Sequence, residues 1–190
     1  MKKLLLITGD LATGKSTFAS MLSRRFGIHA FFKDNIKEVL GDSIGFANRE
    51  ENLRLSRASV QMMLFLFTSF AQADEDLILE ANFRQAELEQ LHRLAEERHY
   101  QVLTLRLQGR EDILHRRYLH RIQQENRHPV HLSPRMDKLE DFAAYLQKGR
   151  ENFVPGAVID IAADDFSYQS DPALWEQIRA FLTVEAAAHS

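Results

Sequence analysis

The sequence contains no cysteine. A disulfide framework, a thiolate metal site and a cysteine nucleophile are therefore excluded. Long apolar runs are missing as well, because the densest stretch, residues 60–70, falls well short of the roughly 20 residues that span a bilayer. The first apolar run, residues 4–7, is too short for the core of a signal peptide. These absences predict a cytoplasmic protein with no membrane partner.

An excess of positive charge is also absent, since the formal net charge is −3. No general basic surface for nucleic acid is expected, although a local basic groove remains open. With 190 residues, of which 45% are hydrophobic, the chain is long enough to bury a full core. No repeat, low-complexity tract or linker divides it, so we expect a single domain over residues 1–190.

Short apolar runs alternate with segments of helical period along the chain. The runs predict strands at residues 3–8, 29–32, 77–79, 101–107 and 157–162. Helices are predicted at residues 15–26, 33–40, 49–73, 85–98, 111–124, 138–150 and 172–184. This alternation predicts a three-layer α/β/α sandwich with about five mostly parallel strands. Ligands of such sheets bind beyond the carboxyl ends of the strands, which selects Gly9, Asp34 and Glu80.

Residues 9–17, GDLATGKST, match the pattern G-x-x-x-x-G-K-[ST] between a predicted strand and a predicted helix. The glycines let the backbone wrap around phosphate oxygens, so that N–H groups and the helix N-terminus face the negative charge. Lysine in this pattern reaches the β- and γ-phosphates, and the following hydroxyl binds magnesium. We therefore expect ATP and Mg²⁺, held by Gly9, Ala12, Thr13, Gly14, Lys15, Ser16 and Thr17.

With this loop in place, the chain resembles the P-loop kinases that include 5′-hydroxyl polynucleotide kinases, chloramphenicol phosphotransferases and zeta-toxin kinases. The resemblance spans nearly the whole chain as an order of elements. It rests on the phosphate loop, on residues 33–37 (KDNIK), on residues 79–83 (LEANF) and on the arginine-bearing residues 117–127. It implies the P-loop nucleoside triphosphate hydrolase fold and transfer of the γ-phosphoryl group of ATP to a hydroxyl.

In those kinases an aspartate after the second strand accepts the proton of the acceptor hydroxyl, and Asp34 holds the matching position. Phosphoryl transfer needs a carboxylate that orients the nucleophile, which agrees with this role. The alternative is that Asp34 caps the following helix. Polynucleotide kinases carry an arginine three residues further on, whereas this chain has Lys37. Lysine lacks the planar fork that grips phosphate in two places, so a nucleic-acid acceptor is not favoured.

The acidic residue Glu80 ends the third predicted strand, and Asn82 follows it. A carboxylate at this edge can hold magnesium through water or bind a substrate hydroxyl. Its alternative is an ordinary strand-end acid. We expect the metal at Ser16 and Glu80, and the acceptor near Asp34, Lys37, Glu80 and Asn82.

Arginines on the predicted helix 111–124 suggest a lid over approximately residues 117–135. Arg117 and Arg121 flank an apolar stripe, and like charges four residues apart are unfavourable unless an anion lies near them. We expect Arg117 to contact the nucleotide, and Arg121 and Arg127 to act in catalysis by neutralising transition-state charge. The alternative is a solvated basic face in which Arg121 pairs with Glu125. Arg116 points the other way, toward Asp112, and is interpreted as structural.

The eight histidines do not suggest a metal site, since His115 and His120 are five residues apart and lack an acidic partner. The favoured function is a kinase that phosphorylates a small-molecule or nucleoside-like hydroxyl acceptor. The alternatives are a polynucleotide 5′-hydroxyl kinase, which needs a basic groove beside Asp34, and a non-catalytic ATP-binding switch. The acceptor itself, the preference for ATP over GTP and the oligomeric state cannot be read from the residues.

Overall fold

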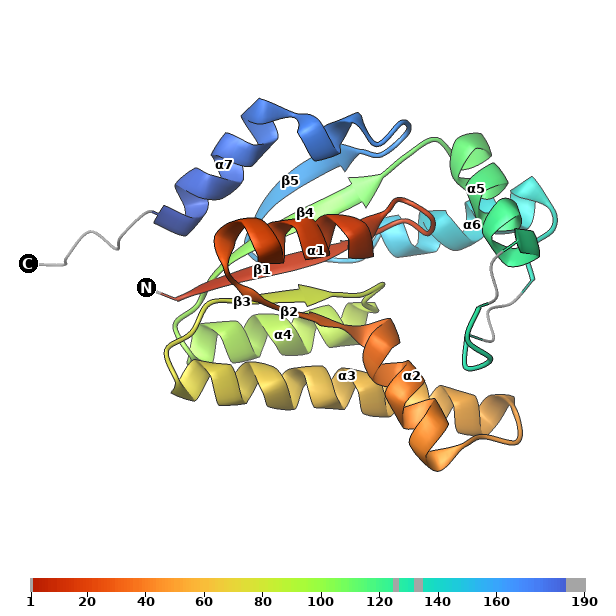
Figure 1. The fold of residues 1–190 in the computed structure, drawn as a ribbon, viewed down its shortest axis with the longest axis horizontal. Coiled ribbons are helices and arrows are strands. Elements are labelled where there is room, and N and C mark those ends of the chain that lie inside the picture. The colour runs from red at the N-terminus through yellow and green to blue at the C-terminus, as the bar shows by residue number, and fades with distance from the viewer. Residues whose placement is uncertain (1, 125–126, 132–134, 184–190) are drawn as a thin grey trace, which may run out of the picture.

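The computed structural model describes residues 2–124, 127–131 and 135–183. Within them, five strands form one parallel sheet in the order β2-β3-β1-β4-β5 (Figure 1). Every strand lies where the apolar pattern predicts one, so the predicted three-layer fold with its parallel sheet is confirmed. The strands are β1 (Lys3–Gly9), β2 (His29–Phe32), β3 (Leu77–Glu80), β4 (Gln101–Gln108) and β5 (Ala157–Ala162).

Seven α-helices are present in the described residues, each overlapping a predicted one. They are α1 (Lys15–Phe26), α2 (Lys33–Ile44), α3 (Arg49–Gln72), α4 (Gln85–Glu97), α5 (Glu111–Gln124), α6 (Leu139–Arg150) and α7 (Pro172–Thr183). Helix α2 is a turn longer than predicted, and ends only where Gly45 adopts a positive φ of 77°. A short 3₁₀ helix, Ser167–Ser170, was not predicted. Residue 184, the predicted end of the last helix, lies outside the described residues.

Alternating residues of β1 bury themselves on opposite faces of the sheet. Leu4 and Leu6 pack into one core cluster with residues of α3 and α4, such as Met63. Leu5 and Ile7 pack into the other cluster, with residues of α1 and α7. Both faces of the strand are therefore covered, which is why its sequence is a continuous apolar run and not an alternating one.

A third cluster joins α5 and α6 beyond the carboxyl ends of the strands, at the right of Figure 1. Leu114 and Tyr118 of α5 pack there against Phe142 and Leu146 of α6. At the same sheet edge Glu80 is in register with Ile7 of β1 and Phe32 of β2. The fold thus brings the starts of α1 and α2 next to Glu80. Helices α5 and α6 lie beyond the same carboxyl ends of the strands. No helix of the described residues is long and apolar enough to cross a membrane.

Candidate active site

The phosphate loop between β1 and α1 depends on backbone conformations that favour glycine. Gly9 has φ 122°, Gly14 has φ 85°, and Ala12 between them has φ 60°. A Cβ atom at Gly9 would lie 2.1 Å from the carbonyl oxygen of Leu107, so any larger residue there would displace β4 from the loop. Tyr168 also stabilises the loop, because its hydroxyl donates a hydrogen bond of 2.8 Å to the carbonyl oxygen of Thr13.

The start of α1 is suited to an anion. Its N-cap, Gly14, provides no side-chain cap, and the first turn carries no acidic residue. Residues 11 and 12 form a turn, and the hydroxyl of Thr13 donates a hydrogen bond of 3.0 Å to the carbonyl oxygen of Asp10 across it. Positive-φ residues alternate there with ordinary ones, which makes the concave array of N–H groups that binds phosphate. The loop therefore fits the triphosphate that its pattern predicts.

Lys15 is 7% exposed, and its ammonium group donates to the carbonyl oxygen of Asp10. Burial lowers the pKa of Lys15, while the carboxylates of Glu80, Asp10 and Asp34 act to raise it. The positive charge of Arg121, from α5, also lowers this pKa. Side chains from α2, β3 and α5 thus act electrostatically on the lysine of the phosphate loop.

Ser16 at the start of α1 contacts Glu80 at the end of β3: the hydroxyl of Ser16 donates a hydrogen bond of 3.0 Å to Oε2 of Glu80. Glu80 is 5% exposed, and burial raises the pKa of its carboxyl against the opposing charge of Lys15. A hydroxyl and a carboxylate are hard oxygen ligands of the kind that magnesium takes together with phosphates and water. This pair fits the predicted metal position. Thr17 follows, exposed in the first turn of α1.

Asp34 is exposed in the first turn of α2, and its charge raises the pKa of both Lys15 and Glu80. Asp34 is therefore an exposed carboxylate whose charge reaches the buried pair Lys15 and Glu80. The capping alternative for Asp34 is wrong, because Phe32 is the N-cap residue and no side chain caps the helix.

Lys37, one turn further along α2, is buried and donates a hydrogen bond of 2.9 Å to Oδ1 of Asn52 in α3. Burial lowers the pKa of Lys37, and no described carboxylate forms a salt bridge with it. Asn82 is half-buried just after β3, and its Oδ1 finds no hydrogen-bond partner within the described part of the chain.

Arg117 and Arg121 diverge, although they lie on neighbouring positions of α5. The guanidinium of Arg117 lies 4.0 Å from the ring centre of Phe166 and donates a hydrogen bond of 2.6 Å to the carbonyl of Ala163. Phe166 also lies next to the phosphate loop, because a Cβ atom added at Gly14 would be 2.9 Å from its ring. Arg117 therefore contacts the loop after β5 beside the phosphate loop, whereas the charge of Arg121 acts on Lys15.

Two other arginines near the lid, Arg110 and Arg116, share one acidic partner. Arg116 pairs with Asp112 at 3.7 Å, which confirms its predicted structural role, and Arg110 pairs with the same carboxylate at 3.1 Å. Arg127 is half-buried in the segment that follows α5. Glu125, the alternative partner for Arg121, lies outside the described residues, as do residues 126 and 132–134 of the predicted lid.

Sequence reasoning missed how residues 127–131, which we call the strap, are fastened to α2 and α3. Val130 is completely buried, and its carbonyl oxygen accepts a hydrogen bond of 2.7 Å from Asn52. A Cβ at Gly41 would lie 2.9 Å from a methyl of Val130, so the strap packs directly on the backbone of α2. A glycine inside a helix was the signal that the sequence contained.

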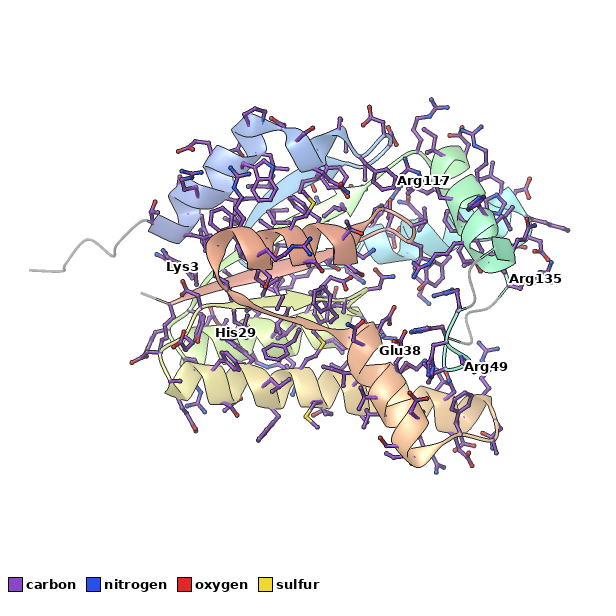
Figure 2. All side chains as sticks on the ribbon, in the orientation of Figure 1. Lys3, His29, Glu38, Arg49, Arg117 and Arg135 are labelled. Carbon is purple, nitrogen blue, oxygen red and sulfur yellow. The ribbon has the colours of Figure 1, made fainter. Side chains whose placement is uncertain are left out.

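Two histidines of the strap complete this attachment. His128 lies 2.9 Å from a carboxylate oxygen of Asp42, and His131 lies 2.6 Å from one of Glu38. Figure 2 shows Glu38 on the side of α2 that faces the strap. The predicted lid is thereby joined to the helix that carries Asp34.

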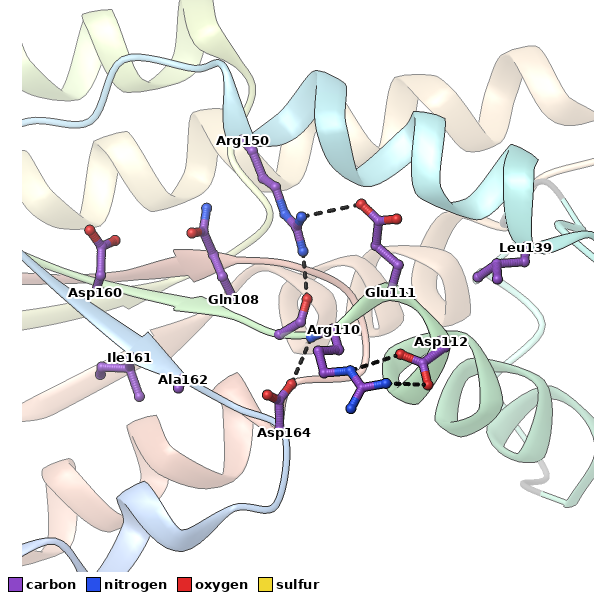
Figure 3. A pocket seen from close by; sticks show the side chains of 11 residues that line it. Gln108, Arg110, Glu111, Asp112, Leu139, Arg150, Asp160, Ile161, Ala162 and Asp164 are labelled. Atoms are coloured by element: carbon purple, nitrogen blue, oxygen red, sulfur yellow. Dashed lines mark hydrogen bonds and ion pairs between the residues drawn. The ribbon is translucent and has the colours of Figure 1, made fainter.

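Two further features of the cleft were not predicted. The pKa of Tyr145 in α6 is raised mainly by partial desolvation, although the residue is 46% exposed, and the charges of Arg84 and Asp34 also act on it. A cavity of about 740 Å³ lies at the carboxyl ends of β4 and β5, lined in part by Arg150 and Glu111 (Figure 3).

Three solved structures illustrate what the chain is similar to. An inferred kinase from Chloroflexus aurantiacus J-10-fl shares 27% identity, with 94% of this chain and 97% of that chain covered and a TM-score of 0.81. Shikimate kinase from Bacteroides thetaiotaomicron shares 20% identity, with 96% and 99% covered and a TM-score of 0.57. A gluconokinase from Sinorhizobium meliloti 1021 shares 14% identity, with 96% and 98% covered and a TM-score of 0.54.

The chain therefore has the fold of the P-loop nucleoside triphosphate-binding kinases. It is similar in structure to P-loop kinases of small molecules. No protein-family model and no curated protein sequence matches it. None of these three structures is named as a polynucleotide kinase, a chloramphenicol phosphotransferase or a zeta toxin, so that finer resemblance stays a prediction.

Proposed function

We propose that this protein is a kinase that transfers the γ-phosphoryl group of ATP to a hydroxyl of a small molecule. One observation carries the proposal: Lys15 is under the charges of Glu80, Asp34 and Arg121 at the carboxyl edge of the sheet, where the hydroxyl of Ser16 also donates a hydrogen bond of 3.0 Å to Glu80. A phosphate-binding loop alone would serve any nucleotide-binding protein. A carboxylate and an arginine facing its lysine are what phosphoryl transfer adds.

The phosphate side of the cleft is formed by the loop of residues 9–17 and Glu80. Its N–H groups and Lys15 would hold the β- and γ-phosphates, with Arg117 contacting the nucleotide beside Phe166. Ser16 and Glu80 would hold magnesium, directly or through water. The bound ion would neutralise phosphate charge during transfer.

The reacting hydroxyl belongs on the side of the cleft where Asp34 lies. Asp34 accepts the proton of this hydroxyl as its oxygen attacks the γ-phosphorus, and the bond from that phosphorus to the bridging oxygen breaks to leave ADP. Arg121 and Arg127 neutralise the charge that spreads over the transferred oxygens. Lys37, Glu80 and Asn82 bind the rest of the acceptor.

A small acceptor is favoured over a polynucleotide. Lys37 is buried and hydrogen-bonded to Asn52, so it does not contribute to an exposed basic groove beside Asp34. Two structural neighbours are kinases named for shikimate and gluconate, which are both small molecules. The strap lies against α2, the helix that carries Asp34, and an acceptor side covered in this way would suit a compact substrate.

The proposal is tested by transfer of radiolabelled γ-phosphate to a panel of acceptors. The panel contains sugars, sugar acids, nucleosides, aminoglycosides, phenicols and 5′-hydroxyl oligonucleotides, with the Asp34→Asn protein as the blank. Acceptor-dependent labelling of one small molecule, lost in the blank, is the expected result. Labelling of the oligonucleotide alone would point to a polynucleotide kinase. Nucleotide binding without transfer to any acceptor class would point to the ATP-binding switch.

A further inference from the structure

The phosphate loop contains a carboxylate of its own, at Asp10. A negative charge at this position opposes the binding of a triphosphate, which has the same sign. Asp10 is 4% exposed, and its carboxylate lies against Arg150 at the end of α6. Nη2 of Arg150 donates to Oδ2 at 2.6 Å, Nε lies 3.2 Å from both oxygens, and the N–H of Gly109 donates to Oδ2 at 3.2 Å.

The same guanidinium also reaches the turn between β4 and α5. Figure 3 shows Arg150 bonded to the carbonyl oxygen of Gly109, at 2.6 Å, and to Oε1 of Glu111, at 3.3 Å. All three nitrogens of the guanidinium therefore have acceptors within the protein. One side chain connects the phosphate loop, the first residue of α5 and the last residue of α6.

These contacts lie where the lid meets the phosphate loop. Helix α5 carries Arg117 and Arg121, and its N-terminal residue Glu111 is bound by Arg150. The carbonyl of Asp10 accepts the hydrogen bond of Lys15, so a shift of Asp10 would move an acceptor of the loop lysine. Nothing in the proposed transfer requires Arg150 to touch the nucleotide.

We infer that Arg150 is a positioning residue, which neutralises Asp10 within the phosphate loop and fixes the base of the α5–α6 lid against that loop. This inference rests on the proposed function for the nucleotide that the loop binds. Removal of one partner of a buried ion pair leaves the other charge without compensation. Without Arg150, the uncompensated carboxylate of Asp10 would repel the phosphates, and α5 would lose one of its attachments.

The decisive experiment is a double-mutant cycle with Arg150→Gln and Asp10→Asn, read out as Mg-ADP affinity by titration calorimetry. Residues that share one network couple strongly, so we expect Arg150→Gln to weaken Mg-ADP affinity roughly tenfold. Asp10→Asn alone should have a small effect, and added to Arg150→Gln it should restore most of the affinity, because no buried charge is then left unpaired. A double variant as weak as Arg150→Gln would overturn the inference, since Arg150 would then act on the nucleotide directly.

Two further variants separate positioning from loss of folding. Arg150→Lys keeps the charge beside Asp10 but cannot bridge three acceptors, so it should retain Mg-ADP affinity while kcat falls. Equal loss of affinity in Arg150→Lys and Arg150→Gln would contradict the neutralising role. The matched control is Arg110→Gln, which removes an exposed arginine paired with Asp112 and should change neither affinity nor kcat. A wild-type protein that does not bind Mg-ADP would overturn the proposed function, and with it this inference.

Discussion

The phosphate side of the cleft and the acceptor side are built by different means. On the phosphate side, backbone geometry and buried strands dominate, and the carbonyl that Lys15 binds is only five residues away in sequence. On the acceptor side, α2 and α3 are joined to the strap by polar contacts between residues 78 to 93 positions apart. A loop formed mainly by backbone geometry is suited to bind phosphate, whereas the strap depends on one buried side chain, Val130, and on a few polar contacts to α2 and α3.

The largest expected effect comes from breaking the phosphate side at Lys15. Lys15→Ala removes the ammonium group that reaches the phosphates, so ATP turnover should fall by about three orders of magnitude or more. Binding of Mg-ATP by calorimetry and steady-state turnover measure this. Lys148→Ala, which alters an exposed lysine of α6, is the control and should behave like wild type. Unchanged binding and turnover in Lys15→Ala would remove the phosphate loop from the mechanism.

The second prediction concerns the acceptor side at Asp34. Asp34→Asn keeps the size of the side chain but cannot take a proton, so kcat for transfer should fall by roughly two to four orders of magnitude. Mg-ADP affinity should change little, because Asp34 faces the phosphate site without belonging to the loop. Near-normal transfer by Asp34→Asn would exclude Asp34 as the catalytic base.

A smaller effect is expected at the strap. In Gly41→Ala the added methyl would lie 2.9 Å from Val130, so the strap should be displaced and cleaved faster in limited proteolysis. Transfer should drop about tenfold through the acceptor KM, since a misplacement far from the chemistry can cost up to about a hundredfold. Gly149→Ala, in α6 with open space around its Cβ, is the matched control and should leave the strap in place. Equal proteolysis of both variants would show that the strap does not need Gly41.

The smallest predicted effect is a gain in folding stability at Glu80. Burial raises the pKa of Glu80, so at pH values between the ordinary carboxyl range and this raised pKa the folded state binds more protons than the unfolded state. The contribution of this group to stability is therefore full at acid pH and declines as pH rises through the raised pKa. Glu80→Gln cannot titrate, and should unfold at a higher denaturant concentration than wild type at neutral pH, yet lose magnesium-dependent transfer. Stability differences that do not vary with pH would contradict this origin.

Local sequence was enough to predict much of the phosphate side. The apolar runs locate all five strands because interior parallel strands are covered on both faces. The glycines at positions 9 and 14 predict the loop because the pattern requires positive-φ conformations there, although the tight contacts of Gly9 with Leu107 and of Gly14 with Phe166 come from tertiary packing. Glu80 could also be placed, since the carboxyl ends of parallel strands share one edge.

Long-range packing decided the rest. Arg117 and Arg121 lie close on a helical wheel, but only the loop after β5 offers Arg117 an aromatic ring and carbonyl acceptors. The attachment of the strap to α2 and the pairing of Asp10 with Arg150 join residues remote in sequence. Periodicity reports which face of an element is buried, whereas the partner of a polar side chain depends on how whole elements are brought together.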